Sequence, residues 1–122
     1  MDWIIIVITL VLLVAYIFLR RKGQISADAA VAHLKHGAIL IDVRSPDEFS
    51  TGHLKGAINM PLQQIETLIV NQVKDKDQVL LLHCQTGMRS GVAKNKVEAL
   101  GYSNAFNLGS YDRAAHIVSR VS

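Results

Sequence analysis

The chain has 122 residues, a length that allows one domain with a single hydrophobic core. Its one cysteine excludes an intramolecular disulfide, and with it a small secreted fold held together by cystines. Of the 13 Lys and Arg residues and 10 Asp and Glu residues, three basic ones stand at 20–22 and one acidic one is Asp2. The remaining ten basic and nine acidic residues nearly balance in charge, so the rest of the chain lacks the positive surface that nucleic-acid binding requires.

The N-terminal segment has the pattern of a membrane anchor. Trp3 to Leu19 is a run of 17 uncharged residues, which the basic triplet at 20–22 ends. As a helix this run is about 25 Å long, near the short end of the range that crosses the hydrocarbon core. The alternatives are a cleaved signal peptide and an aggregation-prone core helix. Against a signal peptide, Asp2 stands in place of a positive n-region and no Ala-x-Ala site follows the run.

The basic triplet also predicts an orientation, because Lys and Arg beside a membrane span favour the cytoplasmic side. We expect a single-pass membrane protein with its N-terminus outside and its domain in the cytosol, at the inner membrane if the chain is bacterial. The expected division is an anchor with its basic flank over residues 1–22 and a folded domain over residues 23–122.

The first half of the domain has the pattern of helix, strand and helix. Ser26 is suited to cap a helix that ends at Gly37. The apolar run 39–43 follows as a buried strand of the kind found in parallel sheets. A short helix then begins with a capping box, in which Ser45 is the N-cap and Glu48 is the third helical residue.

The second half continues the alternation of strands and helices. The expected elements are an extended piece over 57–60, a helix over 62–70, the strongest strand pattern over 78–83, a helix over 90–100, a strand over 105–108 and a helix over 111–120. This order predicts an α/β fold with a parallel central sheet flanked by helices, preceded by one N-terminal transmembrane helix.

The chemistry is predicted in the loop from His83 to Ser90, which joins the strongest strand to a helix. Sites of open α/β sheets form at the carboxyl ends of strands, where Cys84 stands. Gly87 lets the backbone turn so that successive amides converge on an anion, and the helix start and Arg89 add positive charge. We therefore expect Cys84 to be a thiolate, the alternative being a buried structural cysteine.

Three segments of the chain resemble the rhodanese-like sulfurtransferase domain. They are residues 41–49, residues 52–61 and the loop 84–90, and the resemblance extends over 25–108. It implies that Cys84 takes a sulfane sulfur from a small anionic donor such as thiosulfate, holds it as a persulfide, and passes it to cyanide, a thiol or a protein acceptor. This mechanism requires neither a metal nor an organic cofactor.

The resemblance also assigns roles to single residues. The catalytic residue is Cys84, and the residues expected to bind the substrate are Gln85, Thr86, Gly87, Met88, Arg89 and Ser90. Asp42 and Arg44 are expected to support the loop, for example as a salt bridge, the alternative being direct contact with the substrate. Since successive side chains of a strand face opposite sides, His83 is expected to point away from the site. The capping box accounts for Glu48.

Spacing favours sulfur transfer over phosphoryl transfer. Four residues stand between Cys84 and Arg89, whereas the related dual-specificity phosphatases have five, in a larger loop that holds phosphate. A non-catalytic, membrane-tethered module that relays sulfur or binds a protein is the other alternative. The chain departs from the family pattern at Gly109–Ala114, where many members have Gly-Gly, three residues and a Trp. We therefore expect the C-terminal helix to pack differently.

Overall fold

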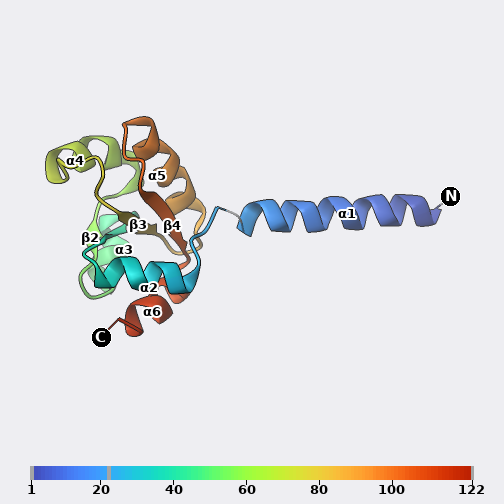
Figure 1. Cartoon of the computed structure of the whole chain (residues 1–122), viewed down its shortest axis with the longest axis horizontal. Helices are drawn as coiled ribbons and strands as arrows, with labels where there is room; N and C mark the ends of the chain where they lie inside the picture. The colour runs from blue at the N-terminus through green and yellow to red at the C-terminus, as the bar shows by residue number, and fades with distance from the viewer. Residues whose placement is uncertain (1, 22, 122) are drawn as a thin grey trace.

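A computed structural model describes residues 2–21 and 23–121, which form an apolar N-terminal helix and an α/β domain (Figure 1). The elements in chain order are α1 (Asp2–Arg21), α2 (Ala27–Lys35), β1 (Ile39–Asp42), α3 (Pro46–Thr51), β2 (Ile58–Asn59), the 3₁₀ turn η1 (Leu62–Gln64), α4 (Ile65–Gln72), β3 (Leu80–His83), α5 (Met88–Ala99), β4 (Ala105–Gly109) and α6 (Tyr111–Ser119).

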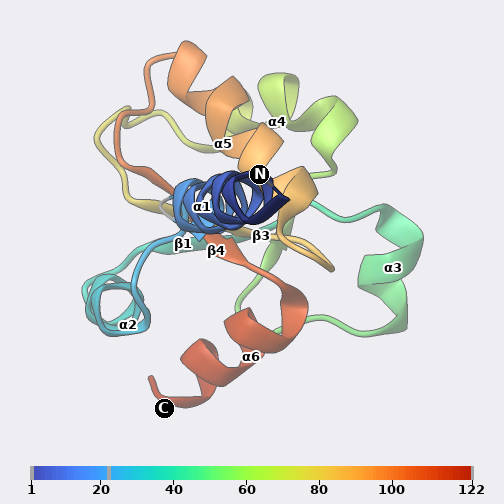
Figure 2. The ribbon, with the colours of Figure 1, turned by 90° about the vertical axis from the view of Figure 1, so that its right-hand side faces the viewer.

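The four strands form one parallel sheet in the order β2-β1-β3-β4. Parallel neighbours need crossover connections, and these place helices on both faces of the sheet. Figure 2 shows α4 and α5 above the sheet and α2 and α6 below it. The predicted fold class, a parallel central sheet between helices, is confirmed.

The strands divide the core into two apolar clusters because their side chains alternate between the faces. Ile41, Leu82 and Cys84 belong to the cluster under α4 and α5. Leu40 and Leu81 belong to the cluster under α2 and α6. Burial on both faces explains the continuous apolar runs in the sequence, and it directs Cys84 toward the face that α5 covers.

The predicted helix starts are confirmed by their caps. The Ser26 hydroxyl accepts from the Ala29 amide at the start of α2. Ser45 and Glu48 form both hydrogen bonds of the capping box at the start of α3. These caps satisfy amides that have no partner inside the helix, typically worth about 1 kcal/mol each.

Two helices differ from their predicted bounds. The pattern over 62–70 is divided between η1 and α4, which extends to Gln72. Helix α5 begins at Met88, two residues before the predicted start, because Gly87 at φ +96° is its N-cap. The early start places Arg89 in the first turn of the helix instead of in the loop.

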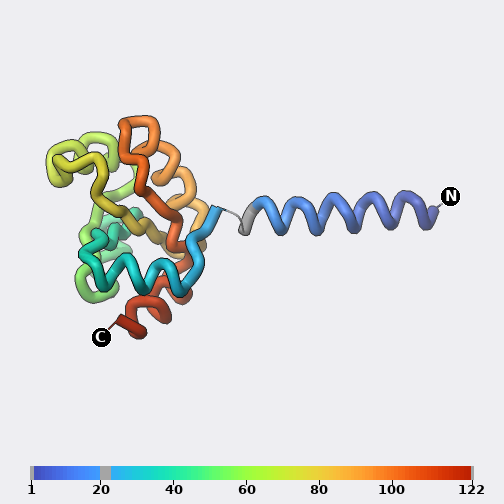
Figure 3. The backbone as a smooth tube through the Cα atoms, viewed as in Figure 1, coloured from blue at the N-terminus to red at the C-terminus, as the bar shows by residue number. Residues whose placement is uncertain are grey.

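Helix α1 is long and apolar enough to cross a membrane. Its window Asp2–Leu19 has a mean hydropathy of 2.7, and none of it is buried. Figure 3 shows the helix extending from the domain without folding back on it. A membrane anchor and a signal sequence share these properties. Three residues of the predicted divisions lie outside the described residues. They are Met1, Lys22 of the basic flank, and Ser122.

Candidate functional site: a cysteine loop at the strand ends

Cys84 lies directly after β3, beneath a ring of hydrogen-bond donors. The Gly87 amide donates to the Cys84 Sγ at 3.0 Å, and the Ser90 hydroxyl donates to the same sulfur at 3.6 Å. The Cys84 amide itself donates to the Gly109 carbonyl at 3.3 Å, which ties the start of the loop to the end of β4. The Cys84 side chain is fully buried, so the loop both contacts the sulfur and covers it.

The surroundings of Cys84 act on its acidity in opposite directions. Burial raises the pKa of the Cys84 thiol, because a charged sulfur loses its hydration. Hydrogen bonds from the Ser90 amide and hydroxyl and from the Gly87 and Thr86 amides lower this pKa. The donors together outweigh burial, so the pKa of Cys84 lies below the ordinary value for cysteine.

The loop and the end of β4 are packed backbone to backbone. Gly87 has φ +96°, a left-handed conformation that side chains disfavour. A Cβ atom at Gly87 would lie 3.3 Å from the backbone of Gly109, so there is no free space for one. Thr86 forms an antiparallel bridge with Ser110 on the other side. The sharp turn that aims the amides at sulfur therefore depends on glycine.

Asn107 in β4 holds the loop in place, a role that the sequence analysis missed. Its side-chain amide donates to the Gly87 carbonyl at 3.1 Å. Its oxygen accepts from the Gly109 amide at 2.9 Å and lies 2.7 Å from the Ser90 hydroxyl, whose single hydrogen can point either to this oxygen or to the Cys84 sulfur. A single amide side chain thus fixes two of the residues that donate to Cys84. The detectable sign was a polar residue inside the apolar strand 105–108.

Arg89 is paired with Glu48 from α3. Its guanidinium donates to the two carboxylate oxygens at 2.6 and 3.0 Å. Hydrogen bonds from Arg89 first, and then from the Ser45 amide, lower the pKa of Glu48 to about 2. The pKa of Arg89 is raised mainly by its hydrogen bond to Glu48 and further by Cys84. Arg89 therefore faces the sulfur while its charge is largely balanced by a carboxylate.

The predicted ion pair of Asp42 and Arg44 is present at the end of β1. The two side chains are buried and meet at 2.8 Å. Arg44 also donates to the Gly52 carbonyl at 2.8 Å and stacks over the Tyr111 ring at 4.6 Å. The pair thus joins the sheet to the end of α3 and to the start of α6.

His83 faces away from Cys84, as predicted from strand alternation. Its ring lies against Tyr111, with 5.8 Å between the centroids. Its Nε2 is 3.8 Å from an Asp42 oxygen and has no hydrogen-bond partner among the described residues. Burial lowers the pKa of His83, which favours the neutral ring.

The other predicted loop residues contribute their backbone. The side chains of Gln85, Thr86 and Met88 are exposed. The Gln85 carbonyl accepts from the Tyr111 amide at 3.2 Å, which attaches the loop to the start of α6. The structure thus brings the sulfur together with Gly87 and Ser90, and it leaves the other three side chains in solvent.

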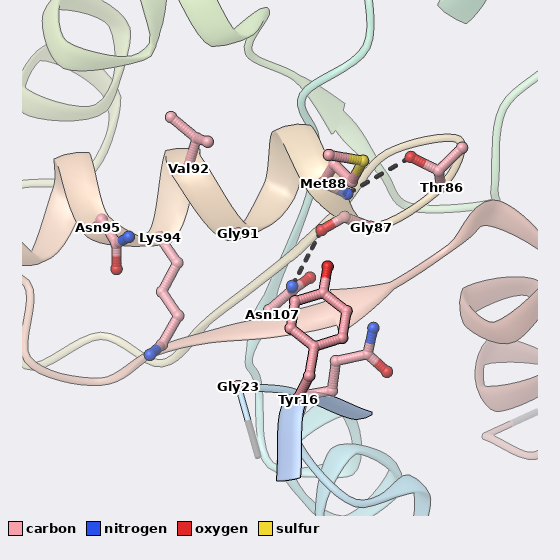
Figure 4. A pocket seen from close by; sticks show the side chains of 11 residues that line it. Tyr16, Gly23, Thr86, Gly87, Met88, Gly91, Val92, Lys94, Asn95 and Asn107 are labelled. Atoms are coloured by element: carbon pink, nitrogen blue, oxygen red, sulfur yellow. Dashed lines mark hydrogen bonds between the residues drawn. The ribbon is translucent and has the colours of Figure 1, made fainter. Parts of the chain in front are cut away.

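A cavity of about 480 Å³ adjoins the loop on its outer side (Figure 4). Cys84 is not among its lining residues, which are Tyr16, Gly23, Gln24, Thr86, Gly87, Met88, Gly91, Val92, Lys94, Asn95 and Asn107. Tyr16 of α1 and Met88 at the start of α5 thus line the same cavity.

Comparison with curated proteins gives relatives, some of which are named as sulfurtransferases. The chain is 38% identical over 69 residues to the thiosulfate sulfurtransferase PspE of Escherichia coli, covering 57% of this chain and 66% of that protein. It is 41% identical over 71 residues to the uncharacterized protein YqhL of Bacillus subtilis, covering 58% of this chain and 55% of that protein. The chain thus spans less than two thirds of the length of these two relatives.

Solved structures share the fold. An Escherichia coli rhodanese with bound anions is 34% identical, with a TM-score of 0.61 over 63% of this chain and 91% of that chain. A human single-domain sulfurtransferase is 28% identical, with a TM-score of 0.67 over 77% of this chain and 96% of that chain. The family model described as the rhodanese-like domain matches residues 26–114, which include both ion pairs and the cysteine loop. The chain belongs to the rhodanese-like domain family.

Proposed function

We propose that the chain is a rhodanese-type sulfurtransferase that carries a sulfane sulfur as a persulfide on Cys84. The observation that supports this most is the ring of donors on the sulfur, formed by the Gly87 and Thr86 amides and by Ser90. A structural cysteine needs no such donors, whereas a nucleophilic thiolate does. Relatives named thiosulfate sulfurtransferase give further support.

In the first proposed step the Cys84 thiolate attacks the outer sulfur of thiosulfate. A bond forms between the two sulfurs, the bond from the outer sulfur to the sulfonate sulfur breaks, and sulfite leaves with that electron pair. Three negative charges are present before and after the step. The loop donors stabilise this charge without having to reorganise, which is the usual contribution of prearranged amides to catalysis.

In the second step a cyanide ion or an acceptor thiolate attacks the outer sulfur of the persulfide. The new bond forms as the bond to Cys84 breaks, and the electron pair of that bond regenerates the Cys84 thiolate. The sulfur passes from donor to acceptor at one oxidation level, so the proposed cycle uses no electron carrier.

The proposal includes a location. Residues 1–22 anchor the chain in a membrane, and the domain over 23–122 lies on the cytoplasmic side, because the basic triplet follows the apolar run. Protease added to inside-out membrane vesicles should then degrade the domain, while sealed right-side-out vesicles should protect it. Degradation in right-side-out vesicles would contradict this orientation, and a soluble, shortened chain would show that the segment is a cleaved signal.

The catalytic proposal is tested with the full chain in detergent micelles, thiosulfate and cyanide. Thiocyanate should form, and Cys84 should gain the mass of one sulfur atom when cyanide is omitted. The Cys84→Ser variant is the control for background. Absence of both signals above that control would refute the proposal. Sulfur on Cys84 without thiocyanate would instead favour a relay module, and Cys84-dependent hydrolysis of a phosphate ester would favour a phosphatase.

A further inference from the structure

The segment that follows α1 is attached directly to the cysteine loop. Gln24 forms a parallel bridge with Asn107, and the Ile25 amide donates to the Asn107 carbonyl at 3.1 Å. The Gln24 side chain lies so close to the loop that a Cβ atom at Gly87 would be 3.3 Å from its Nε2. We call residues 22–25, which follow α1, the tether. Asn107 also bonds Gly87 and Ser90, so the tether and the cysteine loop are held by the same residue.

A second contact fixes the same segment. Arg113 of α6 donates both to the Leu108 carbonyl and to the Ile25 carbonyl, which clamps the tether against β4. The attachment is therefore part of the folded domain, and the distance from the tether to the loop does not vary with the direction in which α1 points.

The chain has little length between this attachment and the apolar helix. Helix α1 ends at Arg21, and only residue 22 and Gly23 separate it from Gln24. At about 3.6 Å per fully extended residue, Gln24 lies within about 11 Å of Arg21. If α1 spans a membrane, the loop around Cys84 is held at the membrane surface. Tyr16 of α1 lines the cavity beside Gly87 and Met88, as Figure 4 shows.

Two apolar side chains on this side of the loop are open to contact. Met88 is 65% exposed and Val92 is 48% exposed, and both line the cavity next to the loop. Thiosulfate and cyanide gain nothing from such surface, because they are small and charged. A polypeptide does gain from it, since burying apolar side chains is favourable. The position and the surface both suit a protein substrate at the membrane.

We propose, resting on the function above, that the sulfur acceptor is a cysteine thiolate of an integral membrane protein, located close to the cytoplasmic end of one of its spans. That thiolate attacks the outer sulfur of the Cys84 persulfide and becomes a persulfide itself. The bond to Cys84 breaks, and its electron pair restores the Cys84 thiolate, so no oxidant or reductant is consumed.

Effective concentration supplies the reason for this preference. Confining donor and acceptor to one bilayer restricts their encounters to a layer at its surface. The concentration of reacting groups in this layer falls roughly as the inverse square root of the length that joins them to their spans. A freely diffusing thiol is not concentrated in this layer. A short tether is therefore suited to an acceptor that is equally close to the membrane.

The test uses the full chain and a synthetic single-span peptide, reconstituted together in vesicles of phosphatidylcholine and phosphatidylglycerol. The only cysteine of the peptide follows its span on a Gly-Ser tail of either about 5 or about 40 residues. Persulfide formation on the peptide is measured by mass spectrometry after Cys84 has been loaded with thiosulfate. A matched protein carries a flexible insertion of about 20 residues between Lys22 and Gly23, which leaves the attachment of Gln24 unchanged.

The natural chain should transfer sulfur to the short-tailed peptide about 2.4-fold faster than to the long-tailed one, because the depth of the layer grows as the square root of the combined length of tail and connecting segment. The insertion should reduce this preference to about 1.5-fold, while both proteins make thiocyanate from cyanide at equal rates. Equal rates for the two tails in the natural chain would overturn the inference. Faster transfer to vesicles that carry a thiol lipid, phosphatidylthioethanol, than to the short-tailed peptide would also overturn it.

Loading of Cys84 separates this inference from the function on which it rests. If Cys84 takes no sulfur from thiosulfate, the sulfurtransferase proposal fails and the inference fails with it. If Cys84 loads and passes its sulfur to cyanide, but shows no dependence on tail length, only the inference about the acceptor is wrong.

Discussion

Arg89 and Glu48, 41 positions apart in the chain, form a two-pronged ion pair that joins α5 to α3. The carboxylate balances the positive charge nearest to Cys84. The acidity of the thiol consequently depends chiefly on neutral donors, the backbone amides and the Ser90 hydroxyl, and less on the guanidinium. The ion pair thus keeps the Arg89 cation in a fixed position beside the cysteine loop.

Removal of this pair should alter the response of stability to acid. The pKa of Glu48 is about 2 in the fold against an ordinary 4.5, so its contribution is complete above about pH 4.5 and is lost as pH falls toward 2. The Glu48→Gln variant should lack this acid-dependent portion. At neutral pH it should lose about 1 kcal/mol or less, since both side chains are partly exposed.

Urea unfolding at a series of pH values measures the effect of Glu48→Gln. Asp47→Asn is the matched control, because it removes an exposed carboxylate from the same helical turn. If Glu48→Gln and Asp47→Asn show the same pH dependence, the ion pair contributes nothing to stability.

Replacement of Ser90 by alanine should make Cys84 less acidic. The Ser90→Ala variant lacks the hydroxyl that donates to the Cys84 sulfur, so the pKa of the thiol should move upward. Alkylation by iodoacetamide at neutral pH should slow roughly 3- to 10-fold, as expected for the loss of one hydrogen bond to a charged group. The pH profile of the rate carries the information, because the buried sulfur limits access at every pH.

Ser50→Ala removes an exposed hydroxyl on α3 and is the control for the Ser90 experiment. Its alkylation profile should coincide with that of the natural chain. An unchanged profile in Ser90→Ala would mean that the hydroxyl does not stabilise the thiolate.

Alanine variants of two glycines with similar φ angles should distinguish backbone strain from an effect on sulfur transfer. Gly87 has φ +96° and Gly37 has φ +94°, and alanine at either position should cost about 1–2 kcal/mol of stability. A Cβ at Gly37 meets open space, whereas one at Gly87 meets the backbone of Gly109 at 3.3 Å. Only Gly87→Ala should therefore lower the rate of thiocyanate formation, by about tenfold or more.

Thermal unfolding measures the stability of the two glycine variants, and the thiocyanate assay measures their activity. Equal activity in Gly37→Ala and Gly87→Ala, at comparable stability, would show that the tight turn is not needed for sulfur transfer.

His83 should make the domain less stable in mild acid. Because burial lowers the pKa of His83 in the fold, the unfolded chain takes up a proton first as pH falls below about 6.5. Stability should be complete above that pH and should then decline by up to about 1.4 kcal/mol per pH unit. His83→Leu should remove this portion of the decline in urea unfolding between neutral and mildly acidic pH.

Substitution of an exposed imidazole, His36→Gln, is the comparison for His83. It should retain the natural pH dependence. A His83→Leu variant with that same dependence would show that His83 is not the group that titrates on unfolding.

The elements of the fold were predictable because short-range patterns encode them. Leu80, Leu81 and Leu82 are apolar without interruption, since both faces of a central strand are buried. Ser45 and Glu48 stand at the fixed offset of a capping box. Each of these features depends on residues that are neighbours in the chain, so no knowledge of the tertiary structure was required.

The partners within the site were not predictable in the same way. Glu48 and Arg89 meet across 41 positions, and Asn107 reaches Gly87 across 20. A polar residue in an apolar strand indicates that it has a buried partner, but it does not identify which loop supplies that partner. Gln24 likewise has the sequence of a linker and acquires its role only by pairing with Asn107.

Cys84 is the only cysteine in these 122 residues, and its side chain is fully buried. Should peroxide oxidise it to a sulfenic acid, no second cysteine of the chain can resolve the lesion as a disulfide. A thiol of another molecule would have to reach the sulfur beneath the Gly87 amide and the Ser90 hydroxyl. The loop that covers Cys84 therefore also controls whether an external reductant can restore its thiol.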